Sequence, residues 1–542
     1  MVVHNHECRA HSHSDVSQLV MQEINRPRRE NSSTPIAAKT LLSTVGFGAS
    51  GLLDVINRLE SHYSMRFSNE WIDEISTCED LVDCIETHCI DSLDRIEIQK
   101  IKTSDSQKRV AQKISTVHVS KSEARAVDKG RTDMETDVEL FPECIALEKR
   151  LQGLTSAGLV NPFLRSNNAV NSRIATIQGR QCISFTSFDY LGLTGHPEVV
   201  TAAKAAIDQF GCSASASRMV GGNNCILDEL DRTLAEFLGT ERAVVFPCGY
   251  GTNASVLSHL FGDGDLILYD ELAHNSIVQG AGASMAGKRS FRHNDWRALD
   301  GLLRDLRSQY RRVVVAIEGV YSMDGDYPDL LKFIEVKNRH GAVLYVDEAH
   351  SLGTMGHRGR GICEHFGVDP SEGDLWMGTI SKALGAGGGY LAGKEAIVRY
   401  LGYTTPAFVF STACSPPNAA AALESLRVLC REPDRVTRLR ERSNLFLKLA
   451  NDCNLDTGAS RDTPVIPVIL GSSARAIHVS QALFSKGINA QPILYPAVRE
   501  SAARIRFFLT SEHTEEQICH TVSTLSKIVA DSAGMVSQSV DE

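Results

Sequence analysis

The sequence lacks the patterns that mark secreted, zinc-binding and membrane proteins. Its 542 residues include 14 cysteines but no Cys-x-x-Cys pair, so we expect neither a zinc ribbon nor a secreted disulfide framework. No apolar run reaches the roughly 18 residues that a membrane-spanning helix needs. The first residues, MVVHNHECRAHSHSD, lack the apolar core of a signal peptide. These absences predict a cytoplasmic protein with reduced cysteines and no membrane span.

Basic and aromatic residues are also scarce. Lys and Arg number 56 against 66 Asp and Glu, which gives a formal net charge of −10, and aromatic residues make up only 6%. Nucleic-acid-binding proteins usually carry a basic surplus, so we expect no nucleic-acid partner. The apolar fraction of 42% is that of an ordinary globular protein. It excludes wholesale disorder, a collagen and a long coiled coil.

The first 139 residues divide into three stretches by composition. Residues 1–15 are rich in histidine but offer no further ligands at a fixed spacing, so we interpret them as a disordered tail and expect no metal site. Residues 16–88 show apolar positions at helical spacing, and nine acidic side chains stand against two basic ones between 50 and 86. Residues 89–139 read as a linker, because few apolar side chains are available to bury.

From about residue 140 the sequence pattern changes to short β-rich runs that alternate with helical ones. Examples are RAVVF (242–246), DLILYD (265–270) and AVLYVDE (342–348). This alternation predicts a mostly parallel sheet with crossover helices. The pattern after about residue 425 predicts a helix, the strand TPVIPVIL, another helix and the strand RIRFFLT, in that order. These patterns predict a large domain over 140–425 and a smaller α+β domain over 426–542.

Several short polar segments follow predicted strands, at the edge where α/β folds bind ligands. FPCGYGTNAS (246–255) joins a strand to a helix through a glycine turn. Free N–H groups at such a helix start bind phosphate, although any tight strand–helix connection also needs glycine. DELAHNS places His274 just after a strand, and EGVYSMDGD places Ser322 in a polar turn.

Two further segments carry a carboxylate and a lysine. In VDEAHSLGTMG, an apolar strand leads to Asp347 and then to His350. A carboxylate there needs a cation or several donors, unless it simply caps the following helical turn. In WMGTISKALGAGGGY, Lys382 is either a surface charge or an amine held inside the protein to form a Schiff base. The GAGGG run lacks the spacing of a nucleotide P-loop.

Taken together, these residues describe a pyridoxal phosphate site. A lysine for an imine, an aspartate for a pyridinium nitrogen, histidines for the ring and a glycine turn for phosphate are the groups that this cofactor needs. Asp347 and Lys382 are 35 positions apart, an interval that is compatible with two neighbouring strands.

Residues 140–542 resemble the α-oxoamine synthases, the pyridoxal phosphate family of the 8-amino-7-oxononanoate, 5-aminolevulinate and serine palmitoyl synthases. The matching strings, in family order and spacing, are SFDYLGL, DELAHNS, EGVYSMDGD, VDEAHSLG, TISKALG and FSTACSPP. The resemblance covers about three quarters of the chain. It implies the type I aminotransferase fold and a homodimer in which both subunits build each active site.

The resemblance also implies roles for residues around the cofactor. Lys382 would hold the cofactor covalently and shuttle the Cα proton, and Asp347 would keep the ring nitrogen protonated. His274 would stack on the ring, and His350 would bond its phenolic oxygen. The remaining cofactor contacts would come from Ser322 near the phenolic edge and, at the phosphate, from Gly249, Tyr250, Thr379 and the Thr412 of the other subunit.

Two positions concern the amino acid substrate. Arg506, in ARIRFFLT, matches the arginine that binds the substrate carboxylate in the family, and Arg504 is a neighbouring but weaker candidate. The family often reads SNDYLGL where this chain has SFDYLGL. Phe188 thus replaces a polar residue near the amino acid, which favours a donor other than glycine. SASASRMVGGNN (213–224) resembles synthases attached to acyl carriers in natural-product pathways.

The implied reaction is a decarboxylative condensation of an amino acid with an acyl thioester, carried by coenzyme A or an acyl carrier protein. It releases thiol and carbon dioxide and yields an α-aminoketone. Alternatives are the reverse cleavage of an aminoketone by coenzyme A, an aminotransferase using the same site, and a non-catalytic partner subunit. Such partner subunits lack the lysine, whereas Lys382 is present.

Residues 16–88 resemble an acyl carrier protein without its attachment site. Carriers bear phosphopantetheine on the serine of Gly-x-Asp-Ser-Leu, and here the serine position is Ala49. Ser50 lies one residue later, about 100° further around a helix, and Ser92 lies in a separate Asp-Ser-Leu-Asp run. Four interpretations stay open: a docking unit without an arm, attachment at Ser50 after a local shift, a second carrier at Ser92, and an unrelated helical domain.

Overall fold

The computed structural model describes residues 138–156 and 158–532. The chain divides into two compact units, Met1–Thr132 and Asp133–Glu542, and all described residues belong to the second. The predictions for the tail (1–15), for the carrier-like unit (16–88, with Ala49 and Ser50) and for Ser92 therefore lie outside the described residues. So does the predicted linker (89–139), apart from its last two residues.

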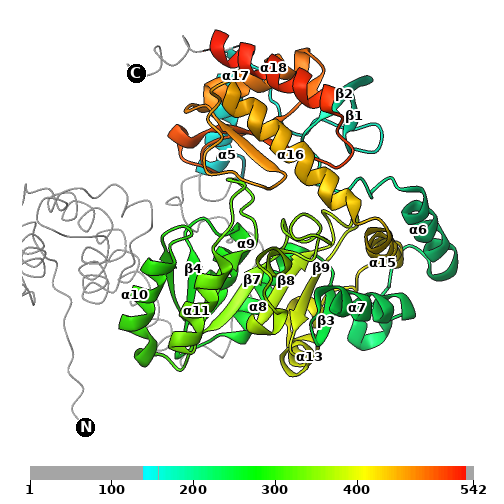
Figure 1. Ribbon diagram of the computed structural model, residues 1–542, viewed down its shortest axis with the longest axis vertical. Helices are drawn as coiled ribbons and strands as arrows, with labels where there is room; N and C mark the ends of the chain where they lie inside the picture. The colour runs from blue at the N-terminus through cyan, green and yellow to red at the C-terminus, as the bar shows by residue number, and fades with distance from the viewer. Residues whose placement is uncertain (1–137, 157, 533–542) are drawn as a thin grey trace, which may run out of the picture. The chain divides into compact units, whose positions relative to one another are not determined.

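The centre of the described unit is a seven-stranded sheet with the order β3-β9-β8-β7-β6-β4-β5 (Figure 1). Only β9 runs antiparallel to its neighbours, as its pairing with β3 and β8 shows, so the predicted mostly parallel sheet is confirmed. The strands are β3 (Arg242–Phe246), β4 (Asp265–Asp270), β5 (Gly287–Phe291), β6 (Arg312–Glu318), β7 (Val343–Asp347), β8 (Leu375–Thr379) and β9 (Gly389–Gly393).

Continuous apolar runs form the middle strands because helices cover both faces of the sheet. All residues of β8 and β9 are buried, as are all but the first residue of β6. The helices of this part are α6 (Pro197–Phe210), α7 (Cys225–Leu238), α8 (Gly249–Leu260), α9 (Asn275–Ala283), α10 (Trp296–Leu306), α11 (Leu330–His340), α12 (Ile362–Phe366), α13 (Glu395–Thr404), α14 (Pro406–Val409) and α15 (Pro416–Arg431). Helix α5 (Pro142–Ser156) lies instead with the smaller body described below (Figure 1).

Side-chain caps set the starts of several of these helices. Asn224 accepts from two backbone N–H groups at the start of α7, and Asp295 does the same for α10. Such caps satisfy N–H groups that have no partner within the helix. Gly239 and Gly341 end α7 and α11 in the left-handed conformation that glycine adopts without strain.

The C-terminal part forms a smaller body with two three-stranded sheets, drawn above the large sheet in Figure 1. Helix α16 begins near α15 and packs along this smaller body (Figure 1). The elements are α16 (Asp434–Asp452), β10 (Val465–Ile469), α17 (Ser473–Ser485), β11 (Ile488–Asn489), β12 (Gln491–Ile493), β13 (Arg504–Phe508) and α18 (Glu515–Asp531), with β1 (Ile174–Ile177) and β2 (Arg180–Ser184) from earlier in the chain.

One of these small sheets combines distant parts of the chain. Strand β2 pairs with β1 and also, in parallel, with β11, where Ile183 faces Ile488. The other small sheet has the order β10-β13-β12 and is antiparallel. Strands β1 and β2, which precede residue 425, therefore share a sheet with β11, which follows it. The division of the chain at that residue stays a proposal.

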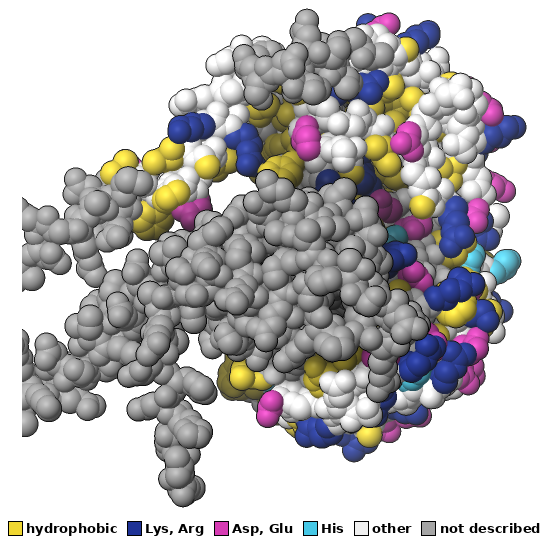
Figure 2. Space-filling view, turned by 90° about the vertical axis from the view of Figure 1, so that its left-hand side faces the viewer, with side chains coloured by type: hydrophobic (Ala, Val, Ile, Leu, Met, Phe, Trp, Pro, Cys, Tyr) yellow, Lys and Arg dark blue, Asp and Glu magenta, His cyan; other side chains and the backbone are white. Residues whose placement is uncertain are grey.

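The described surface mixes charges of both signs. In the view of Figure 2, Lys and Arg side chains alternate with Asp and Glu side chains, and hydrophobic side chains lie in patches between them. Within residues 138–156 and 158–532, no helix is long and apolar enough to cross a membrane.

Candidate functional site

A cavity of about 270 Å³ lies at the carboxyl ends of the strands of the large sheet. Strands β6, β7 and β8 end at this edge, and α8 and α9 begin there. Parallel strands expose backbone groups and loop side chains at this edge, which is where open α/β sheets bind ligands. The lining residues are Cys248, Gly249, Tyr250, Asn253, His274, Ser276, Glu318, Asp347, Ala349, His350, Met377, Thr379, Ser381 and Lys382.

Lys382 lies three residues after the end of β8 and reaches into this cavity. Asp347 ends β7, and it pairs with Met377 of β8. The two residues therefore follow neighbouring strands, as their spacing predicts. Burial lowers the pKa of Lys382 to about 8, although Asp347 and Glu318 oppose this shift. A lysine with a lowered pKa is a better nucleophile near neutral pH than a surface lysine.

Asp347 is held by a network that joins three elements. Its side chain is 3% exposed. Oδ2 accepts from Asn253 Nδ2 at 2.6 Å, and Oδ1 accepts from the backbone N–H of Ala349 at 2.8 Å. Asn253 is itself fixed, because its Oδ1 accepts from the Tyr345 hydroxyl at 2.8 Å and its Nδ2 donates to Ser276 at 2.9 Å. The carboxylate therefore has a fixed orientation beside the cavity.

His274 caps the start of α9. Its ring Nδ1 lies 2.7 Å from the Ser276 hydroxyl, and its backbone N–H donates to Glu318 Oε1 at 2.5 Å. Burial lowers the pKa of His274, which favours the neutral ring. Glu318 is buried below it, and burial together with the charge of Asp347 raises the pKa of this carboxyl well above its ordinary value. A neutral ring in a fixed orientation can stack on a flat heteroaromatic ligand.

His350 is bonded to a residue far away in the sequence. Its Nδ1 lies 2.6 Å from the Tyr190 hydroxyl, 160 residues away. Burial, with the nearby charges of Lys382 and Arg506, lowers the pKa of His350 well below its ordinary value. Burial raises the pKa of Tyr190, so its hydroxyl keeps its proton and can donate to Nδ1. The neutral imidazole then carries its own proton on Nε2, which can donate to a ligand oxygen.

The opposite end of the cavity is built from small groups. Gly249 begins α8, and the Thr379 hydroxyl lies 2.6 Å from that of Ser381. A Cβ added at Gly249 would lie 3.0 Å from the Thr379 Cβ, and one added at Gly389 would lie 2.7 Å from the Gly249 Cα. Backbone N–H groups of a helix start beside two hydroxyls form a phosphate-binding arrangement. With Lys382 and Asp347, this end completes a cavity whose groups fit pyridoxal phosphate.

Gly249→Ala should weaken cofactor binding. The new methyl group would press on Thr379, whose hydroxyl also donates to the Gly388 carbonyl at 2.8 Å. Loss of a hydrogen bond to a charged phosphate should raise the Kd for pyridoxal phosphate about tenfold or more. The Kd can be measured by titrating the cofactor into cofactor-free protein. Gly262→Ala is the control, because a Cβ at Gly262 meets nothing within 4 Å; an equal Kd in both variants would contradict the assignment.

The two arginines of β13 differ in their surroundings. Arg506 Nη1 donates to the Ser322 carbonyl at 2.7 Å, its guanidinium lies 4.5 Å from the centre of the Phe508 ring, and its buried Nε has no hydrogen-bond partner among the described residues. Burial lowers the pKa of Arg506 to about 10, still high enough to keep the charge at neutral pH. Arg504 is instead paired with Asp324 at 2.6 Å. Arg506 is thus the arginine with free donor capacity for a carboxylate.

Two of the predicted cofactor-binding residues, Ser322 and Thr412, do not line the cavity, whereas Tyr250 does. Ser322 does not line the cavity; its backbone carbonyl holds Arg506. Thr412 is exposed in the loop before α15 and does not line the cavity of its own chain. Tyr250 lines the cavity, and its hydroxyl donates to Asn275 at 2.8 Å.

Phe188 stands in an aromatic wall beside Lys382. Its ring centre lies 4.7 Å from that of Phe508 and 5.8 Å from that of His350, both at steep angles. The Lys382 Nζ lies 5.7 Å from the Phe188 ring centre. The ring is 37% exposed, so part of it is open to a ligand.

Sequence reasoning missed five residues of this site: Asn253, Ser276, Glu318, Ser381 and Tyr190. Each of them lies in one of the segments quoted in the sequence analysis. Each is a common residue type next to a residue with more obvious chemistry, so its own role was not recognised. A signal was present for Glu318, because a carboxylate at the end of the apolar strand RVVVAIE is as unusual as Asp347 at the end of AVLYVD.

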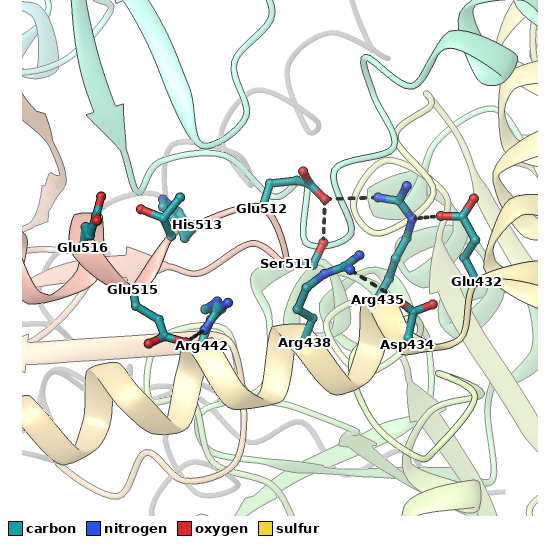
Figure 3. A pocket seen from close by; sticks show the side chains of 11 residues that line it. Glu432, Asp434, Arg435, Arg438, Arg442, Ser511, Glu512, His513, Glu515 and Glu516 are labelled. Carbon is teal, nitrogen blue, oxygen red and sulfur yellow. Dashed lines mark hydrogen bonds and ion pairs between the residues drawn. The ribbon is translucent and has the colours of Figure 1, made fainter.

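A larger hollow of about 980 Å³ lies between α16 and residues 511–516 and shares no lining residue with the cofactor cavity (Figure 3). Its arginines point toward carboxylates, so the charges are paired. Arg435 also donates to the Leu191 carbonyl at 2.9 Å, which supports the loop that carries Phe188. The hollow therefore has a structural explanation. The ion pairs are Arg435 with Glu432 and Glu512, Arg438 with Asp434, and Arg442 with Glu515.

Known proteins are similar to this chain in sequence and in fold. The model of the family described as aminotransferase class I and II matches residues 180–525. The 8-amino-7-oxononanoate synthase of Symbiobacterium thermophilum is 37% identical over 382 residues, which are 70% of this chain and 97% of that protein. The enzyme of the same name from Thermoanaerobacter pseudethanolicus is 36% identical over 383 residues, 70% of this chain and 96% of its own.

Solved structures with a similar fold carry names from the same group of enzymes. Serine palmitoyltransferase from Sphingomonas wittichii superposes with a TM-score of 0.70 at 31% identity and covers 73% of this chain and 99% of its own. The 8-amino-7-oxononanoate synthase from Francisella tularensis superposes with a TM-score of 0.56 at 28% identity and covers 65% of this chain and 98% of its own.

Proposed function

We propose roles for the residues of the cofactor cavity from one premise: the chain belongs to the aminotransferase class I and II family and, within it, to the α-oxoamine synthases. The predicted type I aminotransferase fold and the predicted pyridoxal phosphate dependence are thereby confirmed. The protein is an acyltransferase that condenses an amino acid with an acyl thioester and releases carbon dioxide to give an α-aminoketone.

The single observation that supports the residue roles is the position of Lys382 and Asp347 at the ends of β8 and β7, on one cavity. When bound, pyridoxal phosphate supplies an electron sink for the charge that develops at the amino acid Cα. Asp347 would hold a proton on the ring nitrogen, because its carboxylate is fixed by Asn253 and Ala349. Lys382 would hold the cofactor and then take the Cα proton on Nζ.

The other cavity residues would orient the cofactor and the substrate. His274 would stack on the ring, and His350 would donate its Nε2 proton to the phenolic oxygen. Gly249, Tyr250, Thr379 and Ser381 would hold the phosphate. Arg506 would bind the carboxylate of the amino acid through the N–H groups that do not donate to the Ser322 carbonyl. The buried Asp347 and Arg506 exclude water and replace it by fixed charges, which is how a preorganised site stabilises a developing charge.

We also propose that two chains form the active unit. Large hydrophobic side chains are exposed beside the cavity segments: Phe410 is 84% exposed and Val220 is 80% exposed. Their segments lie side by side, because the Ala413 N–H donates to the Ala216 carbonyl at 3.0 Å. Burying this patch against a second copy would bring its Thr412 toward the phosphate end. Light scattering of the purified protein tests the assembly, and a mass of one chain would contradict it.

The amino acid donor, we propose, carries an apolar side chain. The amino acid would bind beside Lys382, because Nζ is the group that would take its Cα proton. The Phe188 ring centre is 5.7 Å from Nζ, so a side chain on Cα can contact the ring. A phenyl ring offers no hydrogen bond to a hydroxyl and nothing to glycine. Alanine or a larger apolar amino acid therefore fits this wall better than glycine or serine.

The experiment is a panel of carboxyl-labelled amino acids with acyl-coenzyme A, assayed for labelled carbon dioxide and for aminoketone. An apolar amino acid should release carbon dioxide and form aminoketone in equal amounts. Transfer of the amino group without carbon dioxide would instead indicate an aminotransferase. Acyl groups on a separate carrier protein, tested in parallel, distinguish the two proposed sources of the thioester.

Phe188→Asn should change the preference among donors in this assay. Without the ring, the ratio of kcat/KM for the best apolar amino acid over that for glycine should fall about tenfold or more, the size typical of losing a pocket contact. Phe141→Asn is the matched control, because Phe141 is 38% exposed and lies on no cavity segment. An unchanged ratio in the Phe188 variant would rule out contact between this ring and the donor.

A further inference from the structure

His293 is bonded to a carboxylate at each of its ring nitrogens. It lies between β5 and α10, outside the residues that line the cofactor cavity. Nδ1 lies 2.8 Å from Asp270 Oδ1, and Nε2 lies 2.9 Å from Asp326 Oδ2. The Asp270 side chain is fully buried, and that of Asp326 is 8% exposed. An imidazole that donates from both nitrogens must carry both protons and therefore a positive charge.

The surroundings support this charge. Burial alone would lower the pKa of His293, but its bonds to Asp270 and Asp326 raise that pKa to about 10. The Tyr321 ring packs edge-on against the imidazole, with centres 4.5 Å apart. The pair of buried carboxylates would repel each other without the cation between them.

Asp270 belongs to the loop that carries His274. It ends β4, and its Oδ1 also accepts from the Leu272 N–H at 2.9 Å, two residues before His274. Its Oδ2 accepts from the Asn294 N–H at 2.8 Å. The carboxylate thus sets the start of the loop whose end places a histidine over the cofactor cavity.

Asp326 belongs to the turn that holds Arg506. The Asp326 carbonyl accepts from the Tyr321 N–H at 2.9 Å, which closes the turn 321–326. Within that turn, the Ser322 carbonyl accepts from Arg506 Nη1 at 2.7 Å. Displacement of the turn would therefore displace the guanidinium that is available for a carboxylate.

We propose that His293 is a positioning residue for the amino acid substrate. Its charged imidazole ties the loop before His274 to the turn that holds Arg506, and so fixes the distance between the cofactor ring and the carboxylate-binding arginine. It acts through these two segments and touches neither ligand. The inference rests on the proposed role of Arg506.

The direct test is His293→Gln in the full-length, cofactor-loaded enzyme. Glutamine has similar size but donates from only one end, so one of the two buried carboxylates loses the imidazole donor, while Asn294 still donates to both. The KM for the amino acid should rise about tenfold to a hundredfold, as expected for a lost charged hydrogen bond. The KM for the acyl thioester and the Kd for pyridoxal phosphate should each stay within about twofold, whereas a merely structural role would change all three together.

Two further variants serve as a control and as a second test. His340→Gln is the control. His340 Nε2 also lies 2.9 Å from a carboxylate, that of Asp300, but neither residue lines the cavity, so this variant should change neither KM. Asp326→Asn keeps an acceptor for Nε2 while removing one charge, so it should raise the amino acid KM by a smaller factor and serves if His293→Gln does not fold. An unchanged amino acid KM in a folded variant would overturn the inference.

A double-mutant cycle separates this inference from the proposed function. In an Arg506→Gln background, His293→Gln should add less than about twofold to the amino acid KM, because both changes act on one contact. Full additivity would overturn the link to Arg506. If the wild-type enzyme released no carbon dioxide from any amino acid, the proposed donor assignment would fail instead, independently of His293.

Discussion

Lys382→Ala should abolish turnover and covalent cofactor binding together. Lys382 is a buried amine on the cofactor cavity, and burial lowers its pKa to about 8. Alanine can neither bond the cofactor nor move the Cα proton. We expect kcat to fall at least about 10³-fold, within the range for loss of a positioned acid–base group. The visible absorbance of the lysine-linked cofactor should disappear, and borohydride should no longer fix the cofactor to the protein.

The control for this variant is Lys394→Ala. Lys394 is exposed before α13 and does not line the cavity, so its loss should leave absorbance and kcat unchanged. Borohydride followed by peptide mass analysis identifies the modified lysine in the wild-type protein. Retention of the absorbance band or of fixed cofactor after Lys382→Ala would show that another residue holds the cofactor.

Asp347→Asn should reduce kcat about 10²- to 10³-fold, the usual size for loss of a preorganised electrostatic contact. The amide has the shape of the carboxylate and can still accept from Ala349. It lacks the negative charge that would keep the ring nitrogen protonated. Single-turnover measurement of Cα deuterium exchange with solvent follows the affected step directly, because proton removal needs the electron sink.

The same variant should change the ionisation of Lys382. The Asp347 carboxylate raises the pKa of Lys382 against the effect of burial, so its removal should lower that pKa further below 8. Lysine reacts with an aldehyde when it is unprotonated. The midpoint of the pH dependence for cofactor capture by cofactor-free protein should therefore move to lower pH. Asp369→Asn, at an exposed turn, should leave the midpoint in place; a shift to higher pH for Asp347→Asn would contradict the geometry.

Local sequence patterns were sufficient for the elements that carry the site. Apolar runs such as RVVVAIE and AVLYVD predict buried strands, and the polar residue at the end of each run marks the edge of the sheet. The structure confirms that Asp347 and Lys382 follow neighbouring strands. Strand alternation is a local property, so it can be recognised without knowledge of distant contacts.

Contacts between distant segments could not be predicted in the same way. Asn253 reaches Asp347 across 94 residues, and Tyr190 reaches His350 across 160. Strand β2 pairs with β11 at a separation of about 305 residues, as Ile183 opposite Ile488 illustrates. Such pairings depend on how complete elements pack and carry no periodic signal in the chain. The ion pair of Arg504 with Asp324 likewise distinguishes it from Arg506 only in three dimensions.

The sequence by itself determined the chemistry that this protein can perform, because residue types and their places at strand ends decide which groups reach one edge of the sheet. The tertiary structure alone decided which of those groups are charged, fixed or free. His350 is neutral because it is buried beside Lys382 and Arg506, and His293 is charged because two distant carboxylates meet at its ring. Burial and long-range partners set these states, and both come into being only when the chain is folded.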